Sequence, residues 1–166
     1  MLASGCSGGG RPAEPTGRIE VAWTDSAGPT RFAVRADAAW CAADSLFEII
    51  ATRHDTAFGL ILLAADSARG LGPASYAVMP AKTFIPWRPR SIAGLRLVEA
   101  VVIKSFESGS GEVRITEGGP DGLSGTLDVR LVSSNGPDSL HVTGSFADLA
   151  IVPARLPCRR LDKPAG

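Results

Sequence analysis

From Gly111 to Val152 the chain alternates apolar and polar side chains with a period of two. Successive side chains of a β-strand point to opposite faces, so each run has one apolar and one polar face. The apolar faces of the three successive runs carry Val113 and Ile115, then Leu127, Val129 and Leu131, then Leu140, Val142 and Phe146. One buried and one solvated face are typical of an antiparallel sheet. We therefore predict a β-meander with turns at 117–122 and 133–138, which are rich in glycine, proline, asparagine and aspartate.

Two details of this meander concern its packing. Gly125 and Gly144 fall on the buried face, where a side chain would collide with a crossing strand or an aromatic ring. After Phe146 the apolar positions move to Leu149 and Ile151, and this change of phase predicts a β-bulge at 147–148.

The same pattern recurs upstream. Alternating runs at 19–23 and 32–36 predict a hairpin with a longish loop, and further strands are expected at 46–52, 58–64, 75–79 and 95–106. The run at 58–64 is apolar on both faces, which predicts a central strand covered on both sides. A turn is expected at 108–111, and the alanine-rich stretch 36–44 fits either a helical turn or a loop that crosses between sheets.

These elements define the fold class. Strands at short, regular spacing with turn signals between them predict an all-β protein with little helix, an antiparallel β-sandwich or open β-barrel of about eight to nine strands. The 166 residues are enough for one domain with its own core. We place this domain at 18–158 and expect the tail 159–166 to be frayed.

Composition narrows the function classes. Lysine plus arginine equals aspartate plus glutamate, 17 each, so the chain lacks the electrostatic footprint of a protein that binds nucleic acid or an anionic membrane surface. It contains no apolar run long enough to span a bilayer. It also has no phosphate-binding glycine loop, dinucleotide fingerprint or Gly-x-Ser-x-Gly turn, so no cofactor is expected.

The first residues, Met1-Leu-Ala-Ser-Gly-Cys6, resemble the end of a bacterial lipoprotein signal, in which small residues precede the cysteine that becomes lipidated. The charged and apolar regions of such a signal are missing, so we expect an upstream start codon or a trimmed chain. The alternative is a cysteine in a disordered tail. The polar segment 7–17 would be a flexible tether behind the lipidated cysteine, so 1–17 is interpreted as signal remnant, lipidation site and tether.

The other two cysteines are Cys41 and Cys158. Export would place them in an oxidising compartment, where they are expected to form a disulfide; the alternative is two buried free thiols. A metal site is not expected, because the chain has no Cys-x-x-Cys, and neither His54 nor His141 has a ligand-type residue three or four positions later.

Candidate chemistry is sparse. His54-Asp55 is the one adjacent acid/base pair, and it falls where a hairpin turn is expected. His141 falls on the polar face of its strand. The better binding candidate is the irregular segment 82–90, which carries Phe84, Trp87, Arg88 and Arg90, residue types enriched at binding hot spots. The alternative is that its apolar side chains cap the core while the arginines reach water.

The motifs Gly111-Glu-Val-Arg-Ile-Thr116, Ser124-Gly-Thr126 and Val142-Thr-Gly-Ser-Phe146 resemble the C-terminal meander of small bacterial envelope lipoproteins. This resemblance implies a fold and a cellular location, and it implies no catalytic residues. We therefore expect a non-enzymatic binding or structural module, lipid-anchored at Cys6 in the cell envelope and facing the periplasm or the cell exterior. Its partner would be an envelope protein. The alternatives are a carrier of an apolar ligand inside a barrel, and a hydrolytic enzyme that uses His54 and Asp55.

Overall fold

The computed structural model describes residues 14–42, 45–63, 72–81, 83, 89–99, 101–119 and 122–154. Within these ranges the protein is all-β, as the sequence predicted. The strands are β1 (Gly17–Asp25), β2 (Gly28–Ala36), β3 (Ala38–Cys41), β4 (Leu46–Arg53), β5 (Thr56–Leu63), β6 (Ala74–Val78), β7 (Arg90–Glu99), β8 (Val102–Gly118), β9 (Leu123–Ser133), β10 (Ser139–Leu149) and β11 (Ile151–Pro153).

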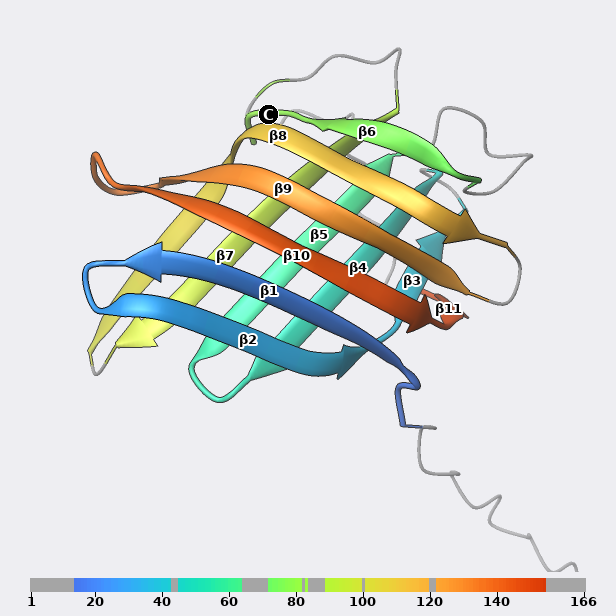
Figure 1. Ribbon diagram of the computed structural model, residues 1–166, viewed down its shortest axis with the longest axis horizontal. Coiled ribbons are helices and arrows are strands. Elements are labelled where there is room, and N and C mark those ends of the chain that lie inside the picture. The colour runs from blue at the N-terminus through green and yellow to red at the C-terminus, as the bar shows by residue number, and fades with distance from the viewer. Residues whose placement is uncertain are drawn as a thin grey trace, which may run out of the picture.

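All eleven described strands belong to one sheet in the order β11-β3-β4-β5-β7-β6-β8-β9-β10-β1-β2. The pairings are antiparallel except β11 with β3 and β6 with β7. The sheet curls into an open half-barrel (Figure 1). In that view β6, β8, β9, β10, β1 and β2 form a front layer, and β7, β5, β4 and β3 cross behind it.

β8 carries the sheet from one layer to the other. It pairs with β7 through Val102 to Glu107 and with β6 through Glu112 to Ile115. Between these stretches its register with β9 shifts at 108–110, and Gly111 has a φ of 128°. A bulge followed by a positive-φ glycine bends a strand and increases its twist, which explains the change of direction here.

The core lies between the two layers. Its members are apolar side chains that are 0–7% exposed, drawn from every described strand except β11. They include Val21, Ile49, Phe58, Leu95, Leu131 and Phe146. Burial of this kind, on the order of 2 kcal/mol for each large apolar side chain, is the main force that holds the layers together.

Several sequence predictions are confirmed. The runs at 19–23 and 32–36 pair as the β1–β2 hairpin, and the turns at 117–122 and 133–138 connect β8 to β9 and β9 to β10. The predicted β-bulge is present, because the register between β9 and β10 shifts between Phe146 and Leu149, with Asp148 at a φ of 53°. β5 lies inside the sheet between β4 and β7, as predicted, but in the described structure only the face with Phe58, Leu60 and Leu62 is buried, so the prediction that both faces are covered is not confirmed.

The two glycines of the meander are also confirmed as close approaches. A Cβ at Gly125 would lie 2.6 Å from the ring of Phe146, and a Cβ at Gly144 would lie 2.8 Å from Cγ1 of Val21. Such distances are shorter than van der Waals contact, so only glycine fits at these positions.

Other predictions were wrong. The strands number eleven in the described chain rather than eight to nine. The ambiguous stretch 36–44 contributes β3, because Ala38 and Trp40 alternate toward the core, where the ring centroid of Trp40 lies 4.5 Å from that of Phe47. The β1–β2 loop is tight rather than long, since Asp25 pairs with Gly28.

The largest correction concerns the predicted strand 95–106 and the predicted turn 108–111. The first is a hairpin, in which β7 ends at Glu99 and β8 begins at Val102. The second lies inside β8 as a bulge. The segment Glu99–Val102 carries no glycine, proline or asparagine, which are the usual turn signals. The sequence therefore gave no reason to divide the predicted strand 95–106 at this point.

Candidate functional site

A shallow, open depression of about 410 Å³ lies on the outer face of the front layer, over β1, β2 and β10. It is lined by a mixture of polar and apolar residues: Ala22, Trp23, Thr24, Pro29, Thr30, Arg31, His141 and Thr143. The register explains this gathering, because Ala22 pairs with Thr143 on one side and with Arg31 on the other. Its volume is within the range of small-ligand sites, but the depression is open rather than enclosed.

His141 is held at this depression by an acidic neighbour. Its Nε2 lies 2.7 Å from Oδ1 of Asp128, on the adjacent strand β9, and the two side chains are 67% and 72% exposed. At such exposure water screens the pair, so its contribution to stability is small. The sequence placed His141 on the polar face correctly, but it did not predict the contact with Asp128, because the register of β9 and β10 brings the two residues together.

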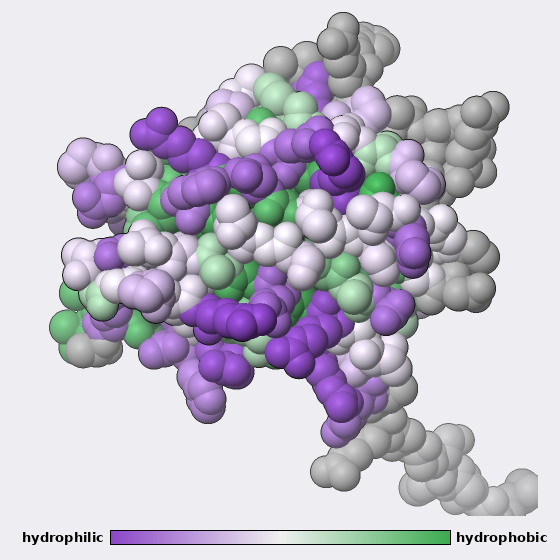
Figure 2. Space-filling model, viewed as in Figure 1, coloured by the Kyte–Doolittle hydropathy of each residue, from purple (hydrophilic) through white to green (hydrophobic). Residues whose placement is uncertain are grey.

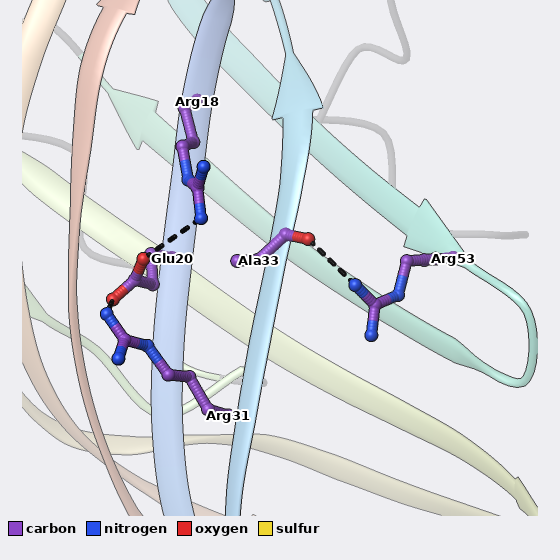
Figure 3. A network of polar contacts seen from close by, with 5 residues as sticks. All are labelled: Arg18, Glu20, Arg31, Ala33 and Arg53. Atoms are coloured by element: carbon purple, nitrogen blue, oxygen red, sulfur yellow. Dashed lines mark hydrogen bonds and ion pairs between the residues drawn. The ribbon is translucent and has the colours of Figure 1, made fainter.

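Three arginines make polar contacts beside β1 and β2 (Figure 3), and of these Arg31 lines the depression. Glu20 on β1 accepts from Arg18, at 3.4 Å, and from Arg31 of β2. Arg53, at the end of β4, donates from Nη1 to the carbonyl oxygen of Ala33 at 3.2 Å. This last contact joins the two layers at the free edge of β2 and occupies an edge carbonyl that could otherwise pair with another chain.

Among the residues that the structure describes, three titratable groups have shifted pKa values. Hydrogen bonding from Ser75, reinforced by Arg114, lowers the pKa of Glu112 on β8. A hydrogen bond to Glu99 raises the pKa of Lys104, and burial raises the pKa of the Tyr76 phenol. None of these groups lines the depression, so the shifts describe local pairing rather than a tuned acid or base.

The predicted binding segment is described only in part. Phe84, Trp87 and Arg88 lie outside the described residues. Arg90 begins β7, pairs with Leu63 of β5, and is 6% exposed. The pair His54-Asp55 is the turn between β4 and β5, with His54 at a φ of 51°. Asp55 accepts there from the backbone N–H of Val98 at 2.8 Å, through its carbonyl oxygen.

Cys6 and Cys158 also lie outside the described residues. Cys41 ends β3, is 2% exposed, and is engaged in an interaction, so it is not a free surface thiol. The lipidation site and the disulfide therefore stay predictions. Among the residues that the structure describes, histidine, cysteine and carboxylate side chains do not gather into a metal-binding group.

One exposed surface was missed by sequence reasoning. We call the end of the β7–β8 hairpin the apolar tip, defined by Val98, Val101, Val102 and Ile103, which are 42%, 96%, 53% and 56% exposed. It lies at the lower left margin of Figure 2, where hydrophobic atoms meet the solvent. The apolar residues Val101, Val102 and Ile103 are evident in the sequence, but their pattern predicted the interior of a strand rather than the end of a hairpin.

Comparisons with known proteins add no family to these observations. No protein-family model, curated protein or solved structure matches the chain. Across the described residues, no helix is both long enough and apolar enough to cross a membrane. The resemblance to envelope lipoproteins therefore depends on the motifs alone.

Proposed function

We propose that this protein is a bacterial envelope lipoprotein, anchored through Cys6, whose β domain is a non-enzymatic binding or structural module. The observation that carries the proposal is the position of the first strand. β1 begins at Gly17, the last residue of the predicted tether, and Glu14, within the tether, contacts Arg35 of β2 at 3.6 Å. A lipidated cysteine eight positions before Glu14 would hold the domain within roughly 30 Å of a membrane surface, given about 3.5 Å per extended residue.

The anchor is tested by expression from the genomic locus, with upstream sequence, followed by cell fractionation and intact mass measurement. We expect membrane association and a mass that begins at Cys6 with a lipid increment. Cys6→Ser should move the protein to the soluble fraction. An unmodified chain in the soluble fraction of the native strain would contradict the proposal.

The binding role is assigned to the depression over β1, β2 and β10. Its threonine hydroxyls, the guanidinium of Arg31 and the imidazole of His141 offer donors and acceptors to a polar ligand or to a polar segment of a partner. Loop and strand positions of this kind determine specificity, while the packed core keeps them in place.

This role predicts a position-specific cross-link in living cells. A photoreactive residue at Thr143, inside the depression, is expected to give a discrete adduct. The same residue at Thr116, exposed on β8 and outside the depression, is the matched control. Equal labelling from both positions, or none from Thr143, would argue against the depression as a binding surface.

A further inference from the structure

The apolar tip protrudes from the sheet. Val101 is 96% exposed, so almost no atom of the described protein shields it. Val98 pairs with Ile103 across the hairpin, so both side chains point to the same face. Glu99 pairs with Val102 at the end of the hairpin, and Nζ of Lys104, which follows Ile103, lies 2.8 Å from a carboxylate oxygen of Glu99. The charge of this carboxylate is therefore balanced by an ion pair.

Hydrogen bonds connect the tip to the free edge of β2. The N–H of Val98 donates to the carbonyl oxygen of Asp55, at 2.8 Å, in the β4–β5 turn. Two residues before Asp55, Arg53 donates to Ala33 of β2 at 3.2 Å. The tip, the β4–β5 turn and the β2 edge therefore form one continuous margin, which we call the rim. It lies along the lower side of Figure 1.

The rim carries arginines and receives the N-terminal segment. Arg31 and Arg35 belong to β2, and Arg18 faces Arg35 from β1. Arg18 and Arg31 share Glu20, Arg35 pairs with Glu14, and Arg53 contacts a neutral carbonyl, so four guanidinium groups contact two carboxylates. β2 ends at Ala36, which pairs with Gly17, and the chain from the predicted anchor enters at this point.

We propose that the rim is the face that this protein presents to a phospholipid bilayer. The aliphatic tip enters the boundary between headgroups and acyl chains, and the arginines contact anionic headgroups. The inference rests on the proposed lipid anchor, because the anchor brings the rim to the membrane. A lipid surface is favoured over a protein partner, because the chain from the predicted anchor enters at the rim and the excess of guanidinium groups there complements anionic headgroups.

The test uses the full chain with Cys6→Ser, so that no acyl chain contributes. Its partition into vesicles of phosphatidylcholine and phosphatidylglycerol, at 3:1, is measured by cosedimentation. Val101→Asp and Ile103→Asp should each reduce the partition coefficient at least tenfold. Ile50→Asp is the matched control: Ile50 is 58% exposed on β4, against 56% for Ile103, and should leave binding unchanged.

A second pair of variants tests the headgroup contacts. Arg35→Gln should weaken binding to the anionic vesicles about fivefold and leave binding to pure phosphatidylcholine unaltered. Arg114→Gln is its control, since Arg114 is similarly exposed and similarly ion-paired on β8, outside the rim. Circular dichroism melts of all variants show whether each remains folded.

Three outcomes would overturn the proposal. They are no binding of the Cys6→Ser chain to either vesicle, equal losses for Ile103→Asp and Ile50→Asp, or a dimer in solution that Val101→Asp dissociates. The last outcome would identify the tip as an interface between copies. An absence of lipid on Cys6 in cells would refute the proposed anchor and leave the vesicle result standing, so the two failures are distinguishable.

Discussion

Replacing Gly125 with alanine is expected to destabilise the domain by about 3 kcal/mol, although it adds a single methyl group. The new Cβ would lie 2.6 Å from Cζ of Phe146 and would also meet the backbone oxygen of Arg114. The ring could move only by displacing neighbours in a close-packed core, and the backbone oxygen belongs to the β8–β9 ladder. The free energy of unfolding is measured by urea denaturation. In a thermal melt we expect Tm to fall by roughly 10 °C.

Gly59 supplies the matched control for this prediction. It also lies in a strand interior, on β5, but a Cβ built there meets no atom within 4 Å. Gly59→Ala should therefore leave stability unchanged or raise it by up to about 1 kcal/mol, because alanine loses less backbone entropy on folding. If the two variants lose stability equally, the effect comes from the strands and not from the close approach.

A double mutant separates the contribution of the Phe146 ring from that of the Arg114 backbone oxygen. Phe146→Ala alone should cost about 3–5 kcal/mol, because Phe146 is 2% exposed and its removal leaves a cavity. Combined with Gly125→Ala, the total loss should be smaller than the sum of the two, since the ring no longer opposes the new methyl group. Full additivity would show that the backbone oxygen of Arg114, and not the ring, makes glycine necessary.

Reduction of the proposed Cys41–Cys158 disulfide is expected to produce the second large loss, up to about 4–5 kcal/mol in the chain-entropy account. The bond would close a loop with a separation of 117 residues, from position 41 to position 158. The measurement is urea denaturation of oxidised protein with and without reductant, accompanied by intact mass. A shift of about two daltons accompanies the opening of one bridge.

The packing of β11 supports this pairing. β11 lies parallel to β3, with Pro153 opposite Trp40, and the N–H of Ala154 donates to the carbonyl oxygen of Trp40 at 3.0 Å. The backbone is therefore beside Cys41 only four positions before Cys158, a stretch that reaches at most about 14 Å. Cys41 is buried at the end of β3 and has an interaction partner.

Two variants separate the disulfide from general effects of reductant. Cys158→Ser should lose the same stability as reduction and should become insensitive to reductant. Cys6→Ser should change neither value, because Cys6 is assigned to the anchor. If reductant leaves both the mass and the denaturation midpoint of exported wild-type protein unchanged, the two thiols are not bonded.

Much of the fold was predictable because it depends on local patterns. The meander from β8 to β10, the β1–β2 hairpin and the bulge at Asp148 follow from period-two alternation, turn residues and one change of phase. The need for glycine at Gly125 and Gly144 followed from their place on the buried face.

The candidate sites were less predictable, because they depend on neighbours distant in sequence. His141 lies beside Asp128 only because β9 and β10 pair in one register, and Arg31 reaches Glu20 only across the β1–β2 pair. The apolar tip escaped prediction for another reason. Valine and isoleucine favour strands, so a turn built of them gives no local signal.

Local side-chain patterns specify the class of this protein: all-β, mainly antiparallel, with one solvated and one buried face on most strands. Each segment carries this information, because side-chain direction in a strand alternates residue by residue. The curl of the sheet, the strands that meet across the core, and the side chains that share the depression and the rim are properties of the folded chain. These depend on strand order and on the bend in β8, where a bulge and Gly111 turn the chain from one layer to the other.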